Sequence, residues 1–104
     1  MQSNLEQNLG YLKMILDGNI GEKIEITSMQ EYNGERAIVL EEYTVKNDGN
    51  DSFDLVLISS EQEVIHYHKT WDVYIEPKLP RSQQWRIMLY HNLGTARLSC
   101  FSSF

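Results

Sequence analysis

The chain has 104 residues, of which 41% are hydrophobic and 23% are charged, and its formal net charge is −6. This length holds a single domain, residues 1–104, because a second core would need more chain. No run approaches the roughly 20 apolar residues of a membrane helix, and the first residues lack the basic and apolar parts of a signal peptide. The single cysteine, Cys100, excludes an internal disulfide, so we expect a cytoplasmic protein in which this thiol is a small buried apolar side chain.

The acidic residues are concentrated in one part of the chain. Residues 17–63 carry 12 of the 15 acids and three of the nine bases, whereas residues 64–104 carry five bases and two acids. Such a distribution repels nucleic acid and anionic membranes, and it attracts a basic protein. The alternative is that the charge only keeps the domain soluble, as a net charge of about −2 to −8 commonly does.

The N-terminal part predicts a helix over residues 3–18. Ser3 and Glu6 fit a capping box, in which each side chain satisfies a backbone N–H of the first turn. Four leucines spaced four, three and four residues apart form one apolar stripe along this helix: Leu5, Leu9, Leu12 and Leu16.

After Gly21 the apolar residues alternate with polar ones, which is typical of β-strands. Asn33-Gly34 is a strong signal for a two-residue hairpin turn, which would place Ile24 opposite Tyr43 if no bulge intervenes. Short connections favour antiparallel neighbours. We therefore predict an α+β fold, with one N-terminal helix packed on a strongly twisted antiparallel meander of five to six strands. The strands are predicted over residues 23–32, 35–46, 53–59, 63–75, 84–90 and 95–101.

The stretch from Val64 to Ile75 predicts a strand with two chemically different faces, because side chains alternate along a strand. One face is apolar and carries Ile65, Tyr67, Trp71, Val73 and Ile75. The other carries His66, His68, Thr70, Asp72 and Tyr74. We interpret this stretch as a central strand whose Trp71 side builds the core.

His66 and His68 lie about 6.6 Å apart along such a strand, so their imidazoles can converge on one metal ion. Asp72 is about 13 Å beyond His68 on a straight strand, which leaves His91 as the candidate third ligand. A His-x-His pair, a later acid and a later His resemble the metal pattern of cupins. The glycine before the first His and the Pro-x-Gly before the last His of that pattern are missing here, so the chain is not assigned to that family. The alternative is that both histidines line a polar sheet face, and we expect neither a metal nor another cofactor.

The sequence shows no arrangement that marks an enzyme. Glu41 and Glu42 are adjacent and so face opposite sides of a strand, while paired catalytic carboxylates must face one cleft. The chain also lacks a glycine-rich phosphate-binding loop. An aromatic and basic patch, typical of protein interfaces, is the alternative to a core role for both tryptophans. Its members would be Trp71, Tyr74, Trp85, Tyr90, Lys78, Arg81 and Arg86.

Three functions remain open from the sequence. We prefer a small acidic inhibitor of the immunity-protein, antitoxin or anti-defence type, which neutralises a basic partner such as a nuclease. The second is an accessory or oligomerising subunit without catalysis. The third is a small-ligand or metal-binding domain that uses His66, His68 and His91. For the first hypothesis we expect the partner to contact Glu31, Tyr32, Glu35, Glu41, Glu42 and Tyr43.

Overall fold

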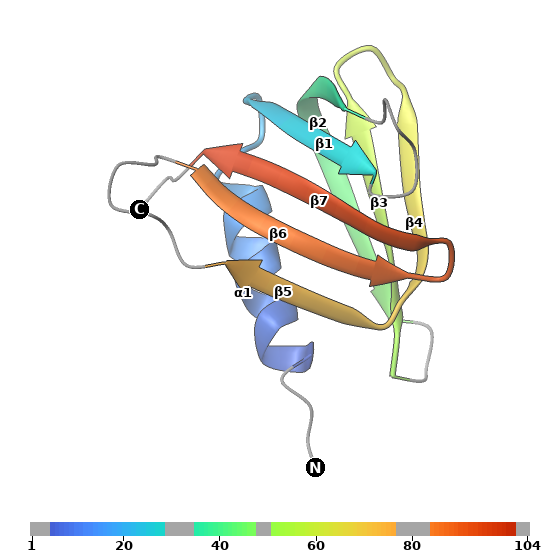
Figure 1. The fold of residues 1–104 in the computed structure, drawn as a ribbon. Helices are drawn as coiled ribbons and strands as arrows, with labels where there is room; N and C mark the ends of the chain where they lie inside the picture. The colour runs from blue at the N-terminus through green and yellow to red at the C-terminus, as the bar shows by residue number, and fades with distance from the viewer. Residues whose placement is uncertain (1–4, 29–34, 48–50, 77–83, 102–104) are drawn as a thin grey trace.

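The structure, a computed structural model, describes residues 5–28, 35–47, 51–76 and 84–101. One helix precedes a seven-stranded antiparallel sheet of order β4-β3-β2-β1-β7-β6-β5 (Figure 1). The predicted α+β fold is confirmed, with seven strands in place of five to six. The elements are α1 (Leu5–Asp17), β1 (Lys23–Ser28), β2 (Arg36–Asn47), β3 (Phe53–Ser59), β4 (Val64–Thr70), β5 (Asp72–Glu76), β6 (Gln84–His91) and β7 (Gly94–Phe101).

The sheet consists of two meanders, β1 to β4 and β5 to β7, which are joined by the pairing of β1 with β7. β4 and β5 are therefore opposite edges of the sheet, although only Trp71 separates them in the chain. At this corner the Trp71 N–H donates to the Tyr90 carbonyl over 2.8 Å, and the Asn92 N–H donates to the His68 carbonyl over 3.3 Å. The sheet is thus strongly coiled, as twisted sheets of this size are, but it is not a closed barrel.

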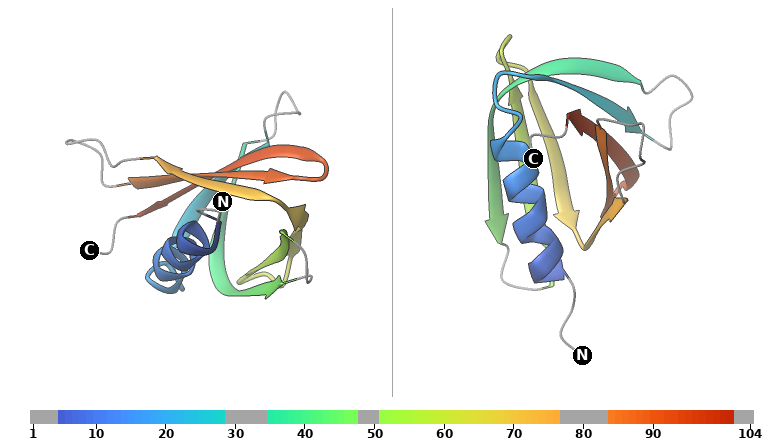
Figure 2. Two further views of the ribbon diagram at one scale, coloured as in Figure 1. Left: turned by 90° about the horizontal axis from the view of Figure 1, so that it is seen from below. Right: turned by 90° about the vertical axis from the view of Figure 1, so that its left-hand side faces the viewer.

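α1 lies on the concave side of the coiled sheet, between its β2–β4 part and its β5–β7 part (Figure 2). The apolar stripe of the helix is buried there as predicted, through Leu12, Ile15 and Leu16. The inward side chains of the strands complete the core with Ile24, Ile26, Ile38, Leu40, Phe53, Leu55, Leu57, Tyr67, Val73, Ile87, Leu89, Ala96, Leu98 and Cys100. Cys100 is fully buried, which confirms its expected role as a packing residue.

A buried asparagine ties the end of the helix to the last strand. The Asn19 amide nitrogen donates to the Ile15 carbonyl over 2.7 Å and to the Phe101 carbonyl over 3.0 Å. Its amide oxygen accepts from the Phe101 N–H over 3.0 Å. Burying an amide is costly unless it is hydrogen-bonded, and here both ends of the amide have protein partners.

The single central strand predicted over residues 63–75 is wrong, because the chain forms two edge strands there. Leu55 of β3 faces Tyr67, but Phe53 faces Thr70, so β4 contains one extra residue. His68 and Lys69 together lie opposite the single residue Asp54. Lys69 has a left-handed backbone with φ of 51°. A β-bulge of this kind exchanges the faces of the side chains that directly follow it.

The bulge explains why Trp71 is not part of the core. Thr70, predicted on the polar face, is fully buried, and its hydroxyl donates to the Tyr67 carbonyl over 3.1 Å. Trp71, predicted on the core face, is 57% exposed. At Val73 the observed face agrees with the predicted one again, because this side chain is buried in the core.

The hairpin register between β1 and β2 also differs from the prediction. Ile24 lies opposite Ile38 and not opposite Tyr43, so the pairing of the two strands is shifted by five residues from the predicted register. That turn, and the capping residue Ser3, lie outside the described residues. Among the residues that the structure describes, no helix has the length and hydrophobicity that crossing a bilayer requires.

Candidate functional site

Carboxylates from three separate segments gather at one end of the coiled sheet, which we call the acidic end. Backbone bonds hold these segments together: the Leu40 N–H donates to the Glu22 carbonyl over 3.0 Å, and the Ser60 N–H donates to the Val39 carbonyl over 2.9 Å. The acidic end comprises Glu22 before β1, Glu35 just before β2, Glu41 and Glu42 in the middle of β2, and Glu61 and Glu63 between β3 and β4, all of them exposed.

A bulge in β2 presents two of these carboxylates to solvent. The pairing of β2 with β3 shifts between Leu40 and Glu42, which leaves Glu41 as the extra residue. Leu40 before the bulge is buried, whereas Glu41 and Glu42 are both exposed. The Glu41 carboxylate accepts a hydrogen bond from the side-chain amide of Gln62 over 2.8 Å, which links β2 to the β3–β4 turn.

Exposed apolar side chains lie on the same segments as these carboxylates. Val39 is 40% exposed and Val64 is 62% exposed, and Ile58 lies in register between Glu42 and Val64. A hollow of about 190 Å³ opens beside Val39 and is lined by Lys23, Ala37, Ile38, Ser59, Ser60, Glu61 and Glu63 as well. Apolar side chains bordered by charged ones are common in protein interfaces.

The basic residues at this end leave an excess of negative charge. Arg36 forms an ion pair with Glu63 across the surface, and Lys23 borders the hollow. Six carboxylates therefore face two bases. Of the predicted contact residues, Glu41 and Glu42 lie within β2 near the β3–β4 turn, and Glu35 lies just before β2 beside Arg36. Glu22, Glu61 and Glu63 were not part of the sequence-based prediction.

Tyr43 does not belong to this surface. Its hydroxyl donates to the Asp17 carboxylate of α1 over 2.6 Å, so the side chain points toward the helix. Burial, and then the neighbouring Asp17 carboxylate, raise the pKa of Tyr43 well above its ordinary value. Tyr43 therefore contacts α1 and is not part of the acidic end, and its contact with a partner stays a prediction. Glu31 and Tyr32 lie outside the described residues.

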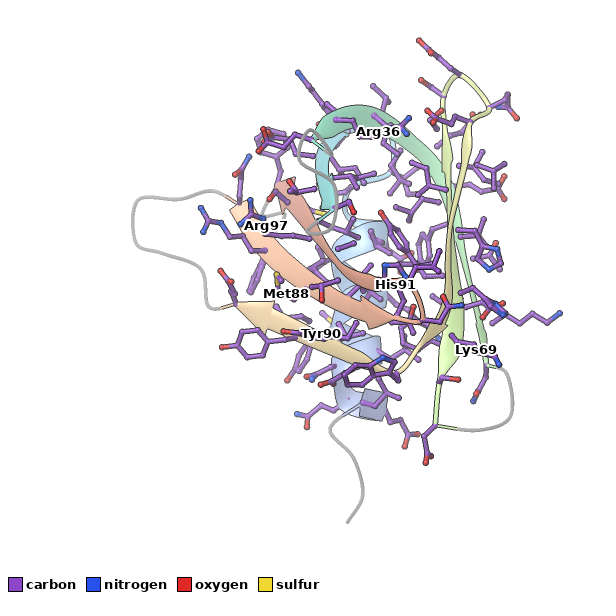
Figure 3. The ribbon with its side chains drawn as sticks, turned by 45° about the vertical axis from the view of Figure 1, so that its right-hand side comes forward. Arg36, Lys69, Met88, Tyr90, His91 and Arg97 are labelled. Atoms are coloured by element: carbon purple, nitrogen blue, oxygen red, sulfur yellow. The ribbon has the colours of Figure 1, made fainter. Side chains whose placement is uncertain are left out.

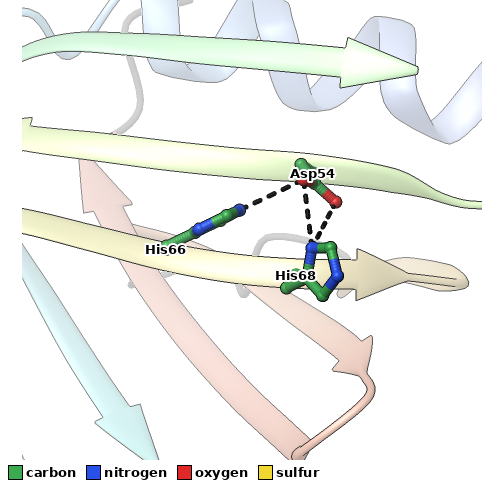
Figure 4. Close-up of side chains that lie close together, drawn as sticks. All are labelled: Asp54, His66 and His68. Atoms are coloured by element: carbon green, nitrogen blue, oxygen red, sulfur yellow. Dashed lines mark hydrogen bonds and ion pairs between the residues drawn. The ribbon is translucent and has the colours of Figure 1, made fainter. Parts of the chain in front are cut away.

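A second polar cluster lies on the outer face of β3 and β4, where two imidazoles flank one carboxylate (Figure 4). The Asp54 carboxylate is 3.2 Å from Nε2 of His66 and 3.1 Å from Nδ1 of His68. Its other oxygen accepts from the Lys69 N–H over 3.1 Å. One nitrogen of each imidazole and one Asp54 oxygen all lie within 4.8 Å of one another.

The third member of this cluster is Asp54 and not His91, so the predicted set of three histidines is wrong. The His91 ring packs edge-on against the ring of Tyr67, with 5.2 Å between the centroids. Tyr67 is buried, which places His91 on the inner side of β4 and away from His66 and His68. Removal from water lowers the pKa of His91.

The position of Asp54 could have been predicted from the sequence. The prediction considered ligands along the histidine strand and the later His91, whereas the nearest neighbours of a side chain in a sheet lie on the adjacent strands. Val56 is opposite His66, so Asp54, two residues earlier on the same face, falls beside His68. Applying the register of the predicted β3–β4 hairpin would have found it.

The Asp54 carboxylate is held in its charged form. The backbone N–H of Lys69 contributes most, and the imidazoles of His68 and His66 add to it, so that the pKa of Asp54 lies below its ordinary value despite partial desolvation. Hydrogen bonds to the charged form of an acid favour that form. The cluster therefore offers a fixed carboxylate between two exposed imidazoles.

The predicted aromatic patch is present in part. Trp71 and the half-exposed Tyr74 lie on the outer side of β5 and the corner before it, and the Trp71 ring contacts that of Tyr90 with 5.5 Å between centroids. Tyr90, Met88 and Arg97 lie along the neighbouring strands of this aromatic face (Figure 3). Trp85 instead packs against the core, Arg86 lies 3.9 Å from Glu76, and Lys78 and Arg81 lie outside the described residues.

No protein-family model, curated protein or solved structure matches this chain. A function must therefore be inferred from the surface chemistry of the described residues. Three surfaces are relevant: the acidic end, the cluster of Asp54, His66 and His68, and the aromatic face.

Proposed function

We propose that this protein binds a basic partner protein through its acidic end and acts as an inhibitor of the immunity-protein, antitoxin or anti-defence type. The observation that carries the proposal is that three segments joined by backbone hydrogen bonds carry six exposed carboxylates together with the exposed Val39 and Val64. A nuclease is a suitable target, because a surface that binds phosphates is basic and complementary to such an end.

Long-range attraction and short-range packing have separate roles in this proposal. The carboxylates raise the association rate of a basic partner, an effect that salt screens over about 8 Å at physiological ionic strength. Burial of Val39, Ile58 and Val64 would supply the contact that persists at higher salt, since apolar area removed from water stabilises a complex. An inhibitor of this kind needs a complementary surface and no catalytic group of its own.

The first test is capture of a partner from the native host, or with the product of the neighbouring gene, followed by calorimetry on the purified pair. Wild-type protein should form a 1:1 complex whose affinity falls with added salt. The double variant Glu41→Lys/Glu42→Lys should bind at least roughly tenfold more weakly, mainly through slower association. The matched control is Glu6→Lys/Asp51→Lys, which changes the net charge equally at exposed positions outside the acidic end.

Equal affinities for wild type and Glu41→Lys/Glu42→Lys would refute the acidic end as the interface. The aromatic face supports the second candidate, an accessory subunit, because exposed Trp and Tyr are enriched in interfaces. Trp71→Ser in the same assay separates the two functions. Loss of the complex in Trp71→Ser alone would assign binding to the aromatic face, and self-association of wild type that Trp71→Ser abolishes would show an oligomerising subunit.

A further inference from the structure

We propose that Asp54, His66 and His68 form a binding site for one divalent transition-metal ion, with zinc as the reference ion. Two imidazoles and one carboxylate would bind the ion from the protein, and the open side of the site would face solvent. This site lies on the outer face of β3 and β4 and involves none of the carboxylates of the acidic end. The proposed metal site can therefore be tested independently of the proposed inhibitor function.

The distances between the donor atoms suit a common ion. Atoms bound to one zinc ion at about 2.0–2.1 Å, with angles of about 90–110° between them, lie about 2.9–3.4 Å apart. The Asp54 carboxylate is 3.2 Å from His66 Nε2 and 3.1 Å from His68 Nδ1. The two imidazole nitrogens are no more than 4.8 Å apart, and both rings are exposed, so a small side-chain rotation brings them into the same range.

The backbone positions the carboxylate for this role. The Lys69 N–H donates to Asp54 because the chain bulges there, and Lys69 adopts a left-handed conformation with φ of 51°. A residue other than glycine in this region is uncommon, and such residues concentrate at functional sites. A hydrogen bond that orients a ligating carboxylate from outside the coordination sphere is also typical of metal sites.

The residue types of the cluster select the class of ion. Metal ligands must be deprotonated carboxylates and neutral imidazoles, so binding at this site should weaken as the pH falls. Imidazole nitrogen favours zinc, copper, nickel and iron, whereas magnesium and calcium favour sites made of oxygen alone. Three protein ligands leave at least one coordination position for water or another molecule, as in zinc sites that are not purely structural.

The test is calorimetric titration of the untagged full chain with Zn²⁺ and, separately, Mg²⁺. We expect one equivalent of Zn²⁺ and no detectable Mg²⁺. Asp54→Asn, His66→Gln and His68→Gln should each weaken Zn²⁺ binding at least about tenfold, since even residues that only orient a ligand commonly cost 10–100-fold. His91→Gln is the matched control, because it removes the third histidine at a position on the other side of β4, and it should leave the affinity within about twofold.

Nuclear magnetic resonance of the amide groups gives a second readout that does not depend on the variants. Zn²⁺ should shift amide resonances of residues 53–55 and 65–69 and leave those of α1 in place. Substoichiometric binding by wild type, unchanged affinity in Asp54→Asn, or an equal loss in His91→Gln would each overturn the three-ligand site. Unchanged affinity in Asp54→Asn with loss in both histidine variants would leave only a pair of surface imidazoles.

Discussion

β4 and β5 are consecutive strands of similar length that face the same core, yet their outer faces and surroundings differ. β4 carries His66 and His68 beside Asp54, whereas β5 and the corner before it carry the exposed Trp71 and Tyr74. The edge of β5 is met by α1, since the Asn8 amide donates to the Val73 carbonyl over 2.8 Å. β4 instead ends in the bulge that turns the chain from one edge of the sheet to the other.

This comparison separates the side chains that build the fold from those available for binding. Tyr67 and Thr70 of β4 and Val73 of β5 point inward, and all three are buried in the core. The outward residues are free of that constraint, so one strand can carry polar ligands while the next carries aromatic rings. Three experiments test this separation.

The largest effect is expected from replacing an inward tyrosine. Tyr67 is 6% exposed, so Tyr67→Ala leaves a cavity and should lower the free energy of unfolding by about 3–5 kcal/mol. Tyr74 is half-exposed, and Tyr74→Ala should change it by about 0.5 kcal/mol or less. Urea unfolding followed by tryptophan fluorescence measures both, and similar losses in the two variants would refute the assigned faces.

A smaller effect should follow from uncovering the edge of β5. Asn8→Ala removes the hydrogen bond to the Val73 carbonyl, and we expect a loss of about 1 kcal/mol together with faster amide exchange in β5 than in β4. Gln7→Ala is the control, because it is the adjacent exposed residue of the same helix. If exchange accelerates equally in both strands, α1 does not protect β5 selectively.

The smallest effect concerns the corner between the strands and depends on pH. Removal from water lowers the pKa of His91 in the folded protein, so the fold favours the neutral ring. Its contribution to stability is present above the pKa of the unfolded state, about 6.5, and is lost as the pH falls through the folded value. His91→Asn should therefore lose less stability than wild type between about pH 7.5 and pH 5. Parallel pH profiles for the two proteins would contradict this role for His91.

Much of the fold followed from local patterns. The leucine stripe predicted α1, and the alternation of apolar residues predicted β2, β3, β6 and β7 at nearly their observed bounds, whereas β4 and β5 were predicted as one strand. Hydrophobic periodicity is local information, because it reflects which side chains one helix or strand must turn from water. The two bulges in β2 and β4 were missed, since an inserted residue leaves no mark in the composition of a strand.

The candidate sites were harder to predict than the strands that carry them. Glu35, Glu41 and Glu42 were selected from charge, and they lie at the acidic end, but Glu22, Glu61 and Glu63 reach it only through pairing between segments. The histidine pair was visible in the sequence, while its carboxylate came from the neighbouring strand. Each error was one of register or face and not of residue type.

The sequence by itself determined the class of fold, the buried stripe of α1, the packing role of Cys100 and the excess of negative charge, because each depends on residue type and spacing alone. The tertiary structure decided that residues 64–76 form both edges of one coiled sheet, with Trp71 exposed at the corner. It also decided that Asp54, and not His91, stands between His66 and His68. Strand order and register depend on pairings between distant segments, and the bulge in β4 exchanges the faces of Thr70 and Trp71, which directly follow it.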